Sequence, residues 1–258
     1  MTASVVSAKR RPRSRATFTS VLGELLLTAG VLVMLFVAWQ MWIGDIIISA
    51  QHNAEGAEVS AEWAAEPAPE LPPLITDEET GEEFYEPPIL EHPADGQEFA
   101  RMLIPRFGDD YNVAIAGGTT RSVTLDKIGI GLYTQSKMPG EVGNFSLAGH
   151  RTTWGKPFNK IDKLRVGDAI VVETPEGWYT YRFRTLEYVT PTQVDVLLDV
   201  PQMPQLDTDE RYITLTACSP LYSLAERIVA YGVFEGFQPR AEGPPDSLAP
   251  VDVAPPSV

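Results

Sequence analysis

An uncharged apolar segment near the start of the chain places the strongest constraint on its fold. It runs from Leu25 to Gly44 as LLLTAGVLVMLFVAWQMWIG, between Glu24 and Asp45. A helix of this length, at about 1.5 Å per residue, crosses a hydrocarbon core of about 30 Å. It is longer than the roughly 7 to 15 residues of a signal-peptide core, so we expect an uncleaved transmembrane helix over residues 20–45.

Basic side chains gather just before this segment and predict its orientation. The stretch AKRRPRSR holds Lys9, Arg10, Arg11, Arg13 and Arg15. Because basic flanks are retained on the cytoplasmic side of a membrane, we expect residues 1–19 in the cytoplasm. The chain after the helix is then extracellular and attached to the cell membrane by a single pass. Trp39 and Trp42 suit the outer membrane interface.

The acidic charge of the chain is concentrated in one stretch. The net charge is −15, yet residues 51–100 hold fourteen acidic residues and no lysine or arginine, while residues 101–238 hold fourteen basic and sixteen acidic ones. The acidic stretch is rich in proline and has no sustained hydrophobic period, which predicts a disordered linker over residues 46–96, a stalk of roughly 40 Å. Docking of residues 74–90 on the domain as a regulatory strap is the alternative. Residues 239–258 are expected to form a disordered tail.

Residues 97–238 carry the pattern of one all-β domain. Apolar residues recur with a period of two in short runs that turn residues separate, which is typical of a barrel or a sandwich. The sequence TPEGW is a hairpin signal, because Gly177 can adopt a positive φ. The predicted strands cover residues 99–105, 112–117, 144–151, 169–175, 177–190, 211–218 and 227–236.

Short helices and one competing helix interrupt this strand pattern. RSVTLDKIG, residues 121–129, and PFNKIDKLRVGD, residues 157–168, can each form a turn or two of helix. The segment SPLYSLAERIVAYGV also fits a helix that begins at Pro220. Val229, Tyr231 and neighbouring residues favour a strand there instead, because β-branched and aromatic side chains suit a pleated sheet.

Cys218 is the only cysteine of the chain, and alternation predicts the strand face that it occupies. In a strand over 211–218, one face carries Ile213, Leu215 and Ala217, and the other carries Thr214, Thr216 and Cys218. The thiol therefore lies on the more polar face. A short connection then returns the chain antiparallel and brings Arg227 close to it. A lone extracellular cysteine is exposed to oxidation, so its presence suggests that the thiol has a functional role.

A nucleophilic cysteine needs a neighbour that favours its thiolate, and a leaving amine needs a proton donor; a histidine serves both needs. His52 and His92 fall in the expected linker, whereas His150 ends the run NFSLAGH and opens into a polar loop. All three histidines precede Cys218, which excludes the papain-like order. The residues alone leave two interpretations open: a Cys-His-Arg site, or a buried cysteine with an unrelated histidine and arginine.

Several motifs resemble the sortase family, and within it the class E type of actinobacteria. They are MPGEVGNFSLAGHR at 138–151, PTQVDVL at 191–197, and TLTAC at 214–218 followed by ERIVAYG at 226–232. The resemblance covers residues 97–237 and extends to the N-terminal anchor. It implies an all-β fold, an eight-stranded closed β-barrel with short helices behind one transmembrane helix.

The resemblance also implies a cysteine transpeptidase. The Cys218 thiolate would attack a sorting signal of the Leu-Ala-x-Thr-Gly or Leu-Pro-x-Thr-Gly type between Thr and Gly, with Leu-Ala-x-Thr-Gly preferred by class E. His150 would protonate the leaving amine, and Arg227 would bind the substrate backbone or stabilise the oxyanion. Secreted proteins with a C-terminal sorting signal are the implied partners, and an amine of a peptidoglycan precursor or of a pilin resolves the thioacyl-enzyme.

The same resemblance implies a groove for the sorting signal. Residues 187–206 would supply its loop and floor, including Thr192 and Val194. The signature strand would add Thr214, Leu215, Thr216 and Ala217 as substrate-binding residues. Ala217 departs from the family signature, which has threonine there. Because alternation turns the Ala217 side chain away from the thiol, we expect Cys218 to remain a functional nucleophile.

Two other functions are compatible with these motifs. A pilin-polymerising sortase would use the same three residues with a pilin lysine as acceptor, and a catalytically weak module could bind sorting signals without cleaving them. Ala217 is the feature that keeps the weak binding module open as an interpretation.

No cofactor or metal site is expected; calcium at Asp109, Asp110 or Glu141 is conceivable but not indicated. Basic residues form no excess or cluster in the domain, so no nucleic acid is expected.

Overall fold

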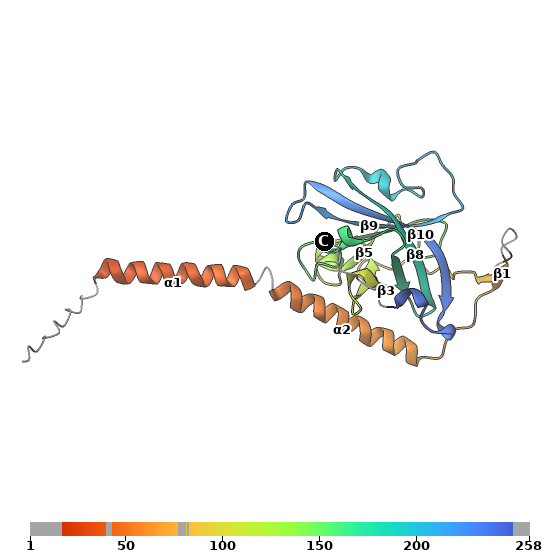
Figure 1. The fold of residues 1–258 in the computed structure, drawn as a ribbon, viewed down its shortest axis with the longest axis horizontal. Helices are drawn as coiled ribbons and strands as arrows, with labels where there is room; N and C mark the ends of the chain where they lie inside the picture. The colour runs from red at the N-terminus through yellow and green to blue at the C-terminus, as the bar shows by residue number, and fades with distance from the viewer. Residues whose placement is uncertain (1–16, 40–42, 77–80, 82, 250–258) are drawn as a thin grey trace, which may run out of the picture. The chain divides into compact units, whose positions relative to one another are not determined.

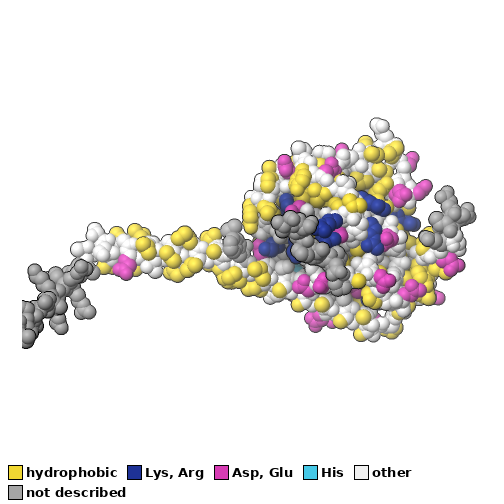
Figure 2. Space-filling view, viewed as in Figure 1, with side chains coloured by type: hydrophobic (Ala, Val, Ile, Leu, Met, Phe, Trp, Pro, Cys, Tyr) yellow, Lys and Arg dark blue, Asp and Glu magenta, His cyan; other side chains and the backbone are white. Residues whose placement is uncertain are grey.

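The N-terminal apolar segment forms a long helix. The computed structural model describes residues 17–39, 43–76, 81 and 83–249, and separates into two units between Gly44 and Asp45. In the first unit, α1 spans Phe18–Ala38 and is the one helix among the described residues that is long and apolar enough to cross a membrane. Figure 2 shows apolar side chains along its whole length. The basic cluster and Trp42 lie outside the described residues.

The second unit is built on a closed barrel of eight strands (Figure 1), and the expected eight-stranded barrel is confirmed. Around the barrel the order is β10, β8, β7, β3, β4, β5, β6 and β9, which pairs with β10 again. The pairs β4/β5 and β6/β9 are parallel, and the others are antiparallel. The strands are β3 (Glu98–Leu103), β4 (Asn112–Gly117), β5 (Ile130–Leu132), β6 (Gly143–Gly149), β7 (Ala169–Glu173), β8 (Gly177–Val189), β9 (Arg211–Ser219) and β10 (Glu226–Pro239).

The interior of the barrel holds one hydrophobic core, to which alternate residues of the strands contribute. Ile213, Leu215 and Ala217 of β9 all belong to it, as the alternation predicts. Tyr179 and Tyr181 of β8 are fully buried there. Their hydroxyls keep hydrogen-bond partners, because the Tyr179 hydroxyl donates to the Pro88 carbonyl and the Tyr181 hydroxyl accepts from the Gly140 N–H. Burial of these large rings therefore leaves no unpaired hydroxyl.

All seven predicted strands are present, with boundaries shifted by a few residues. β5 is not predicted, because three residues are too few to show a period. The helix considered from Pro220 is wrong, since the chain turns there and forms β10. Gly177 has φ of 152°, which confirms the predicted β7–β8 hairpin. The short helices are η2 (Pro105–Phe107), η3 (Arg121–Leu125), η4 (Ile161–Lys163), η5 (Val194–Leu197), η6 (Arg240–Glu242) and η7 (Asp246–Leu248).

The prediction of a disordered linker over 46–96 is wrong for its first twenty residues. They belong to α2, Gly44–Ala65. Residues 46–65 contain six alanines and no proline, and the prolines begin only at Pro67. Composition averaged over the whole linker therefore concealed a segment with strong helix propensity.

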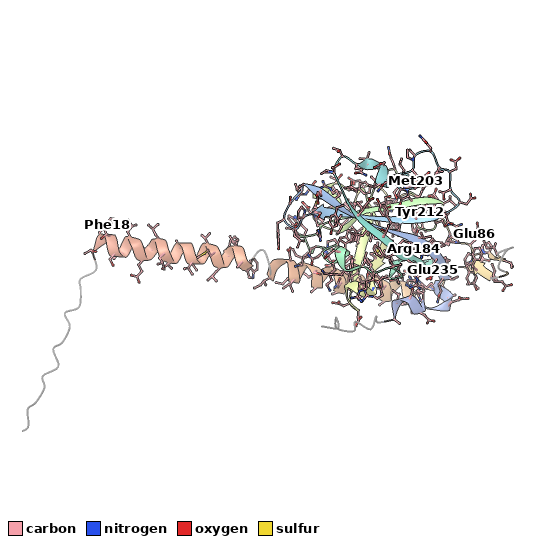
Figure 3. All side chains as sticks on the ribbon, turned by 45° about the horizontal axis from the view of Figure 1, so that its top comes forward. Phe18, Glu86, Arg184, Met203, Tyr212 and Glu235 are labelled. Carbon is pink, nitrogen blue, oxygen red and sulfur yellow. The ribbon has the colours of Figure 1, made fainter. Side chains whose placement is uncertain are left out.

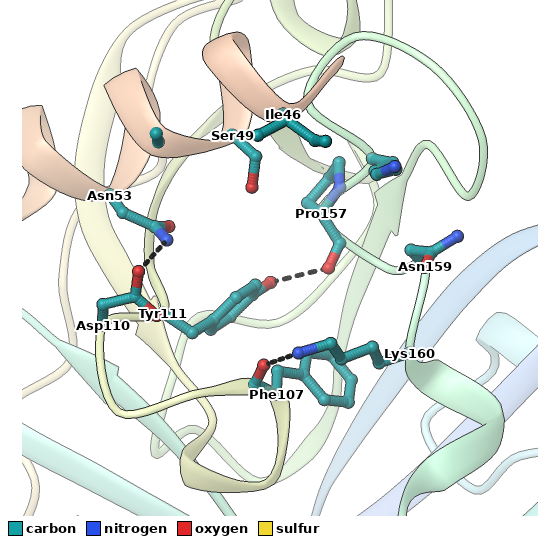
Figure 4. A pocket seen from close by; sticks show the side chains of 11 residues that line it. Ile46, Ser49, Asn53, Phe107, Asp110, Tyr111, Pro157, Asn159 and Lys160 are labelled. Carbon is teal, nitrogen blue, oxygen red and sulfur yellow. Dashed lines mark hydrogen bonds between the residues drawn. The ribbon is translucent and has the colours of Figure 1, made fainter. Parts of the chain in front are cut away.

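α2 packs against the outside of the barrel. The Asn53 side chain donates to Asp110 at 3.3 Å and accepts from the backbone N–H of Asn112 at 3.3 Å. Beside these contacts, α2 and the barrel enclose a cavity of about 300 Å³ (Figure 4), across which the Tyr111 hydroxyl donates to the Pro157 carbonyl. These polar contacts tie the first half of the expected stalk to the folded domain.

A buried ion pair joins both segments that were expected to be disordered. Glu173, the last residue of β7, accepts from Arg240 at 3.0 Å and from the Ser60 hydroxyl of α2 at 2.5 Å. The Arg240 guanidinium lies 5.7 Å from the ring centre of Trp63 and 4.7 Å from that of Trp178. The expectation of a disordered tail is therefore wrong for residues 239–249, and residues 250–258 lie outside the described part.

The segment between α2 and the barrel also contacts the domain. β1, Leu74–Thr76, and β2, Glu83–Tyr85, form a two-stranded antiparallel sheet. The Tyr85 hydroxyl donates to Glu242 at 2.7 Å, and Tyr85 and Leu90 pack against the barrel core. Docking of this segment is thus observed for residues 85–90, whereas its regulatory role stays a prediction.

Removal of Glu173 should destabilise the second unit strongly. Glu173→Ala leaves Arg240 buried without its partner, and breaking a buried ion pair in this way costs about 3–5 kcal/mol. Denaturant unfolding of the full chain in detergent measures the loss. Glu235→Ala is the control (Figure 3 labels Glu235), because it breaks an exposed pair with Arg182 and should cost about 1 kcal/mol or less. Equal losses for the two variants would contradict the assigned role of Glu173.

Candidate active site

Three neighbouring strands bring the candidate catalytic residues together. β6 runs parallel to β9 with Ala148 opposite Thr216, so His150 and Cys218 follow at the same level, one just past the end of β6 and the other near the end of β9. β9 runs antiparallel to β10, and Cys218 lies directly opposite Arg227. Side chains of residues directly opposite each other project from the same face of a sheet. The predicted antiparallel return that brings Arg227 to the thiol is confirmed.

Cys218 lies on the outer, polar face of β9, as alternation predicts. Its thiol is free and partly exposed. On the same face, the Thr216 hydroxyl donates to the Leu147 carbonyl at 3.2 Å and shares a hydrogen bond of 2.9 Å with the Tyr133 hydroxyl. β9 is therefore held in place by hydrogen bonds of its side chains as well as by the backbone hydrogen bonds to its neighbouring strands.

The thiol faces an open cavity of about 570 Å³. His150, Cys218 and Arg227 all line it, together with Tyr133, Tyr222 and Leu224. Tyr222 and Leu224 belong to the β9–β10 connection and are largely exposed. The cavity combines a nucleophile, a proton carrier and a fixed positive charge with apolar walls, which is the set of groups that acyl transfer requires.

The imidazole of His150 contacts a carboxylate that the sequence did not reveal. Nε2 of His150 lies 2.6 Å from Oδ1 of Asp126, and the two side chains are only 15% and 19% exposed. The Arg121 guanidinium lies 3.4 Å from the same oxygen. Asp126 precedes His150 by 24 residues, in a segment predicted only as a helical turn. No spacing rule links such residues, so only the fold shows the contact.

Two arginines hold the loops around the cavity. Nη1 of Arg227 donates to the carbonyls of Leu224 at 3.2 Å and Glu226 at 2.9 Å, so its guanidinium is fixed at the turn beside Cys218. Arg151, which is buried, donates to the Ser219 hydroxyl at 3.3 Å and pairs with Asp162 at 3.5 Å. This hydrogen bond joins Arg151, which follows His150, to Ser219, which follows Cys218.

The structure separates the residues predicted to bind substrate into three groups. Thr216 and Ala217 line the cysteine cavity, although the Ala217 side chain itself belongs to the barrel core. Thr214 and Leu215 are fully buried, which contradicts the prediction that they contact a substrate; the Thr214 hydroxyl donates to Asn144 at 2.8 Å and has a structural role. Thr192 is exposed, and its hydroxyl shares a hydrogen bond with that of Thr190.

A second cavity of about 770 Å³ adjoins the first. Val194, Leu197 and Met203 line it, and all three come from the 187–206 segment predicted as the floor of a groove. Tyr133 lines both cavities, which makes it the border between them. The 187–206 segment therefore provides an apolar surface beside the site that holds the thiol.

Two of the three acidic residues considered for calcium, Asp110 and Glu141, form hydrogen bonds within the protein. Glu141 accepts from the backbone N–H of Met138 at 2.9 Å, and Asp110 accepts from Asn53 at 3.3 Å. Within the described ranges, no group of three or more His, Cys, Asp or Glu side chains is arranged to hold a metal ion.

Comparison with known proteins identifies the family. The sequence model of the sortase domain matches residues 102–235. Sortase SrtE1 of Streptomyces coelicolor is 35% identical over 254 residues, which cover 94% of this chain and 66% of that protein. Sortase SrtE2 of the same organism is 33% identical over 231 residues, covering 87% of this chain and 85% of that protein.

The chain belongs to the sortase family. Sortases are cysteine transpeptidases, and solved sortase structures share this barrel. The crystal structure of sortase E1 from Streptomyces coelicolor with a tripeptide in the active site is 38% identical, with a TM-score of 0.56 over 60% of this chain and 99% of that one. SrtA sortase from Actinomyces oris is 35% identical, with a TM-score of 0.59 over 67% of this chain and 97% of that one.

The departure at Ala217 should affect the stability of this sortase more than its catalysis. The Ala217 side chain is 3% exposed and lies in the barrel core opposite Ile228. Ala217→Thr adds volume and a hydroxyl to a packed core, which should lower the free energy of unfolding by about 1–3 kcal/mol. We expect kcat/KM for peptide transfer to stay within about threefold.

Denaturant unfolding and a peptide-transfer assay on the same preparation measure the two effects. A more than tenfold loss of kcat/KM at unchanged stability would contradict this assignment, and so would a gain of similar size.

Proposed function

We propose that this sortase is anchored in the cell membrane, cleaves a C-terminal sorting signal between Thr and Gly, and transfers the cut protein to an amine of the cell wall. The observation that carries the proposal is the strand register, which sets Cys218 opposite Arg227 on β10 and level with His150 after β6. These residues also line one cavity. We assign Cys218 as nucleophile, His150 as acid and base, and Arg227 as the oxyanion or backbone ligand.

The first half of the proposed reaction forms a thioester. The Cys218 thiolate attacks the threonine carbonyl carbon, and the negative charge that develops on its oxygen is stabilised by the Arg227 guanidinium. The C–N bond to glycine then breaks, and His150 gives its proton to the departing amine. The products are a thioacyl-enzyme, a neutral imidazole and a released peptide with a glycine N-terminus.

The second half restores the enzyme. An acceptor amine attacks the thioester carbonyl and loses a proton to His150. The C–S bond breaks, Cys218 leaves as thiolate, and a new amide joins the two molecules. The His150 imidazole serves first as acid and then as base. At the end of the cycle Cys218 is again a thiolate and His150 is again protonated, as at the start.

The two adjoining cavities support a peptide that runs past the thiol. The apolar side chains of Val194, Leu197 and Met203 suit the leucine of a sorting signal, and the cysteine cavity suits the threonine carbonyl. Tyr133 then lies between them, beside the second residue of the signal. Because the family relatives are of class E, we propose Leu-Ala-x-Thr-Gly as the preferred signal.

The membrane anchor fits substrates that are themselves secreted. α1 is apolar along its length, and basic residues precede it in the sequence, which supports a single pass with the catalytic domain outside. Secreted proteins that carry a sorting signal reach the same membrane face. The acceptor is an amine of a peptidoglycan precursor or of a pilin, and the assay below includes a probe for each.

The experiment is a transfer assay with the full chain in detergent. A fluorescent peptide containing Leu-Ala-x-Thr-Gly is incubated with triglycine or with a lysine-containing pilin peptide, and products are separated by chromatography. We expect amide product from the native chain and a loss of more than about 1000-fold for Cys218→Ala and His150→Ala, as for removal of a nucleophile or its base. Arg227→Ala should lower kcat by about 100-fold or more, in line with loss of an oxyanion donor.

Arg184→Ala is the matched control, since this exposed arginine lies on β8 (Figure 3 labels Arg184). It should leave the rate unchanged. If native chain and Cys218→Ala gave the same trace of product, the catalytic proposal would fall and the weak binding module would be favoured. Higher kcat/KM for Leu-Pro-x-Thr-Gly than for Leu-Ala-x-Thr-Gly would overturn the proposed signal preference.

A further inference from the structure

We infer that Asp126 is a positioning residue for His150 that fixes which ring nitrogen exchanges protons with the thiol and the substrate. The inference deepens the proposed function, because it rests on His150 as the acid and base. Its starting observation is the 2.6 Å contact between Nε2 of His150 and Oδ1 of Asp126.

The carboxylate is held in place by its own backbone. Asp126 is the C-cap residue that follows η3, and its N–H donates to the Arg121 carbonyl at 2.8 Å. The same helical turn is anchored to the barrel by Thr124, which is fully buried and donates from its hydroxyl to the Gly117 carbonyl of β4 at 3.0 Å. The helical turn that carries Asp126 is therefore fixed to the barrel, which fixes the position of the Asp126 carboxylate.

The contact has the geometry of a strong hydrogen bond. Hydrogen bonds to charged groups are short, and this one is shielded from water, since neither side chain is more than one fifth exposed. An ionised carboxylate only accepts, so the proton of this hydrogen bond must belong to Nε2. In the neutral imidazole, that assignment leaves Nδ1 as the acceptor.

The proton chemistry therefore falls to Nδ1. Among the residues that the structure describes, Nδ1 has no hydrogen-bond partner, and the histidine lines the cavity that contains Cys218. When the imidazole is protonated, Nδ1–H is the proton that can pass to the leaving amine. When it is neutral, the Nδ1 lone pair can accept the proton of the acceptor amine. Without Asp126 the ring could rotate or change tautomer, and either change would misplace that lone pair.

Arg121 is a weaker participant in the same cluster. Its guanidinium lies 3.4 Å from the carboxylate oxygen that His150 contacts, but its side chain is 68% exposed. Water and salt screen such a contact. Arg121 also lines the cavity that contains Cys218, so the matched control is taken elsewhere. Glu235→Gln likewise turns a carboxylate into an amide, at an exposed ion pair with Arg182 away from that cavity.

The test combines a spectroscopic readout with kinetics on the full chain in detergent. Labelling with ¹⁵N-histidine gives signals from only three residues, His52, His92 and His150. His150→Ala identifies the His150 signals by difference. We compare the native chain with Asp126→Asn, Asp126→Ala and the control Glu235→Gln, and record the ¹⁵N shifts at a pH where the imidazole is neutral.

We expect one tautomer for His150 in the native chain, with the proton on Nε2. Asp126→Asn, whose amide both donates and accepts, should produce a mixture or the Nδ1–H form, with the His52 and His92 signals unchanged. The kcat for transfer should fall by about 10- to 100-fold with KM within about twofold, by analogy with the loss seen when a group that orients a metal-bound histidine is removed. Glu235→Gln should leave both readouts close to native, because this exposed carboxylate contacts Arg182 and does not line the cavity.

Two results would overturn the inference: a native His150 with its proton on Nδ1, or an unchanged tautomer and kcat in both Asp126 variants. If Asp126→Ala does not fold, Asp126→Asn still gives both readouts, because it keeps the shape of the side chain. The tautomer is measured without substrate. A native chain that forms no thioacyl-enzyme would therefore refute the proposed function, while the spectrum would still decide the role of Asp126.

Discussion

The proposed active site depends above all on the pairing of three strands, β6, β9 and β10. The parallel pair β6/β9 sets His150 level with Cys218, and the antiparallel pair β9/β10 sets Arg227 opposite the thiol. A shift of one residue in either register would turn one of these side chains to the other face of the sheet. The register is protected by burial, because Ile213, Leu215 and Ala217 must remain in the core. Packing of the barrel interior therefore positions the three proposed catalytic residues on the barrel exterior.

Much of this arrangement was visible in the sequence because alternation is a strong local signal. The face of Cys218, the return of Arg227 and all barrel strands except the short β5 follow from a period of two. Asp126 could not be found in this way, since its contact with His150 joins a helical turn to a distant strand end. The sequence pattern also misassigned Thr214 and Leu215, because membership of a signature does not distinguish residues that hold the strand from those that meet a substrate.

The expected linker and tail were misjudged for a different reason. Composition over 46–96 is dominated by prolines and acidic residues that follow α2, and the helix itself has little amphipathic signal to reveal it. The helix is also held by contacts far along the chain, since Glu173 accepts a hydrogen bond from Ser60 of α2 and pairs with Arg240 of the tail. This cluster of Glu173, Ser60 and Arg240 has no local sequence signature, since each residue taken alone is expected to be an ordinary solvent-exposed polar group. α2, which follows α1 in the sequence, therefore belongs to the same folded unit as the barrel.

The central claim is that Cys218 becomes acylated by a sorting signal. Its most direct test is the intact mass of the full chain, quenched with acid after mixing with a Leu-Ala-x-Thr-Gly peptide in the absence of acceptor amine, followed by peptide mapping. We predict an added mass equal to the peptide up to its threonine, located on the fragment that contains Cys218 and removed by hydroxylamine. An adduct on any other residue, or none on the native chain under conditions in which the peptide is consumed, would contradict the account.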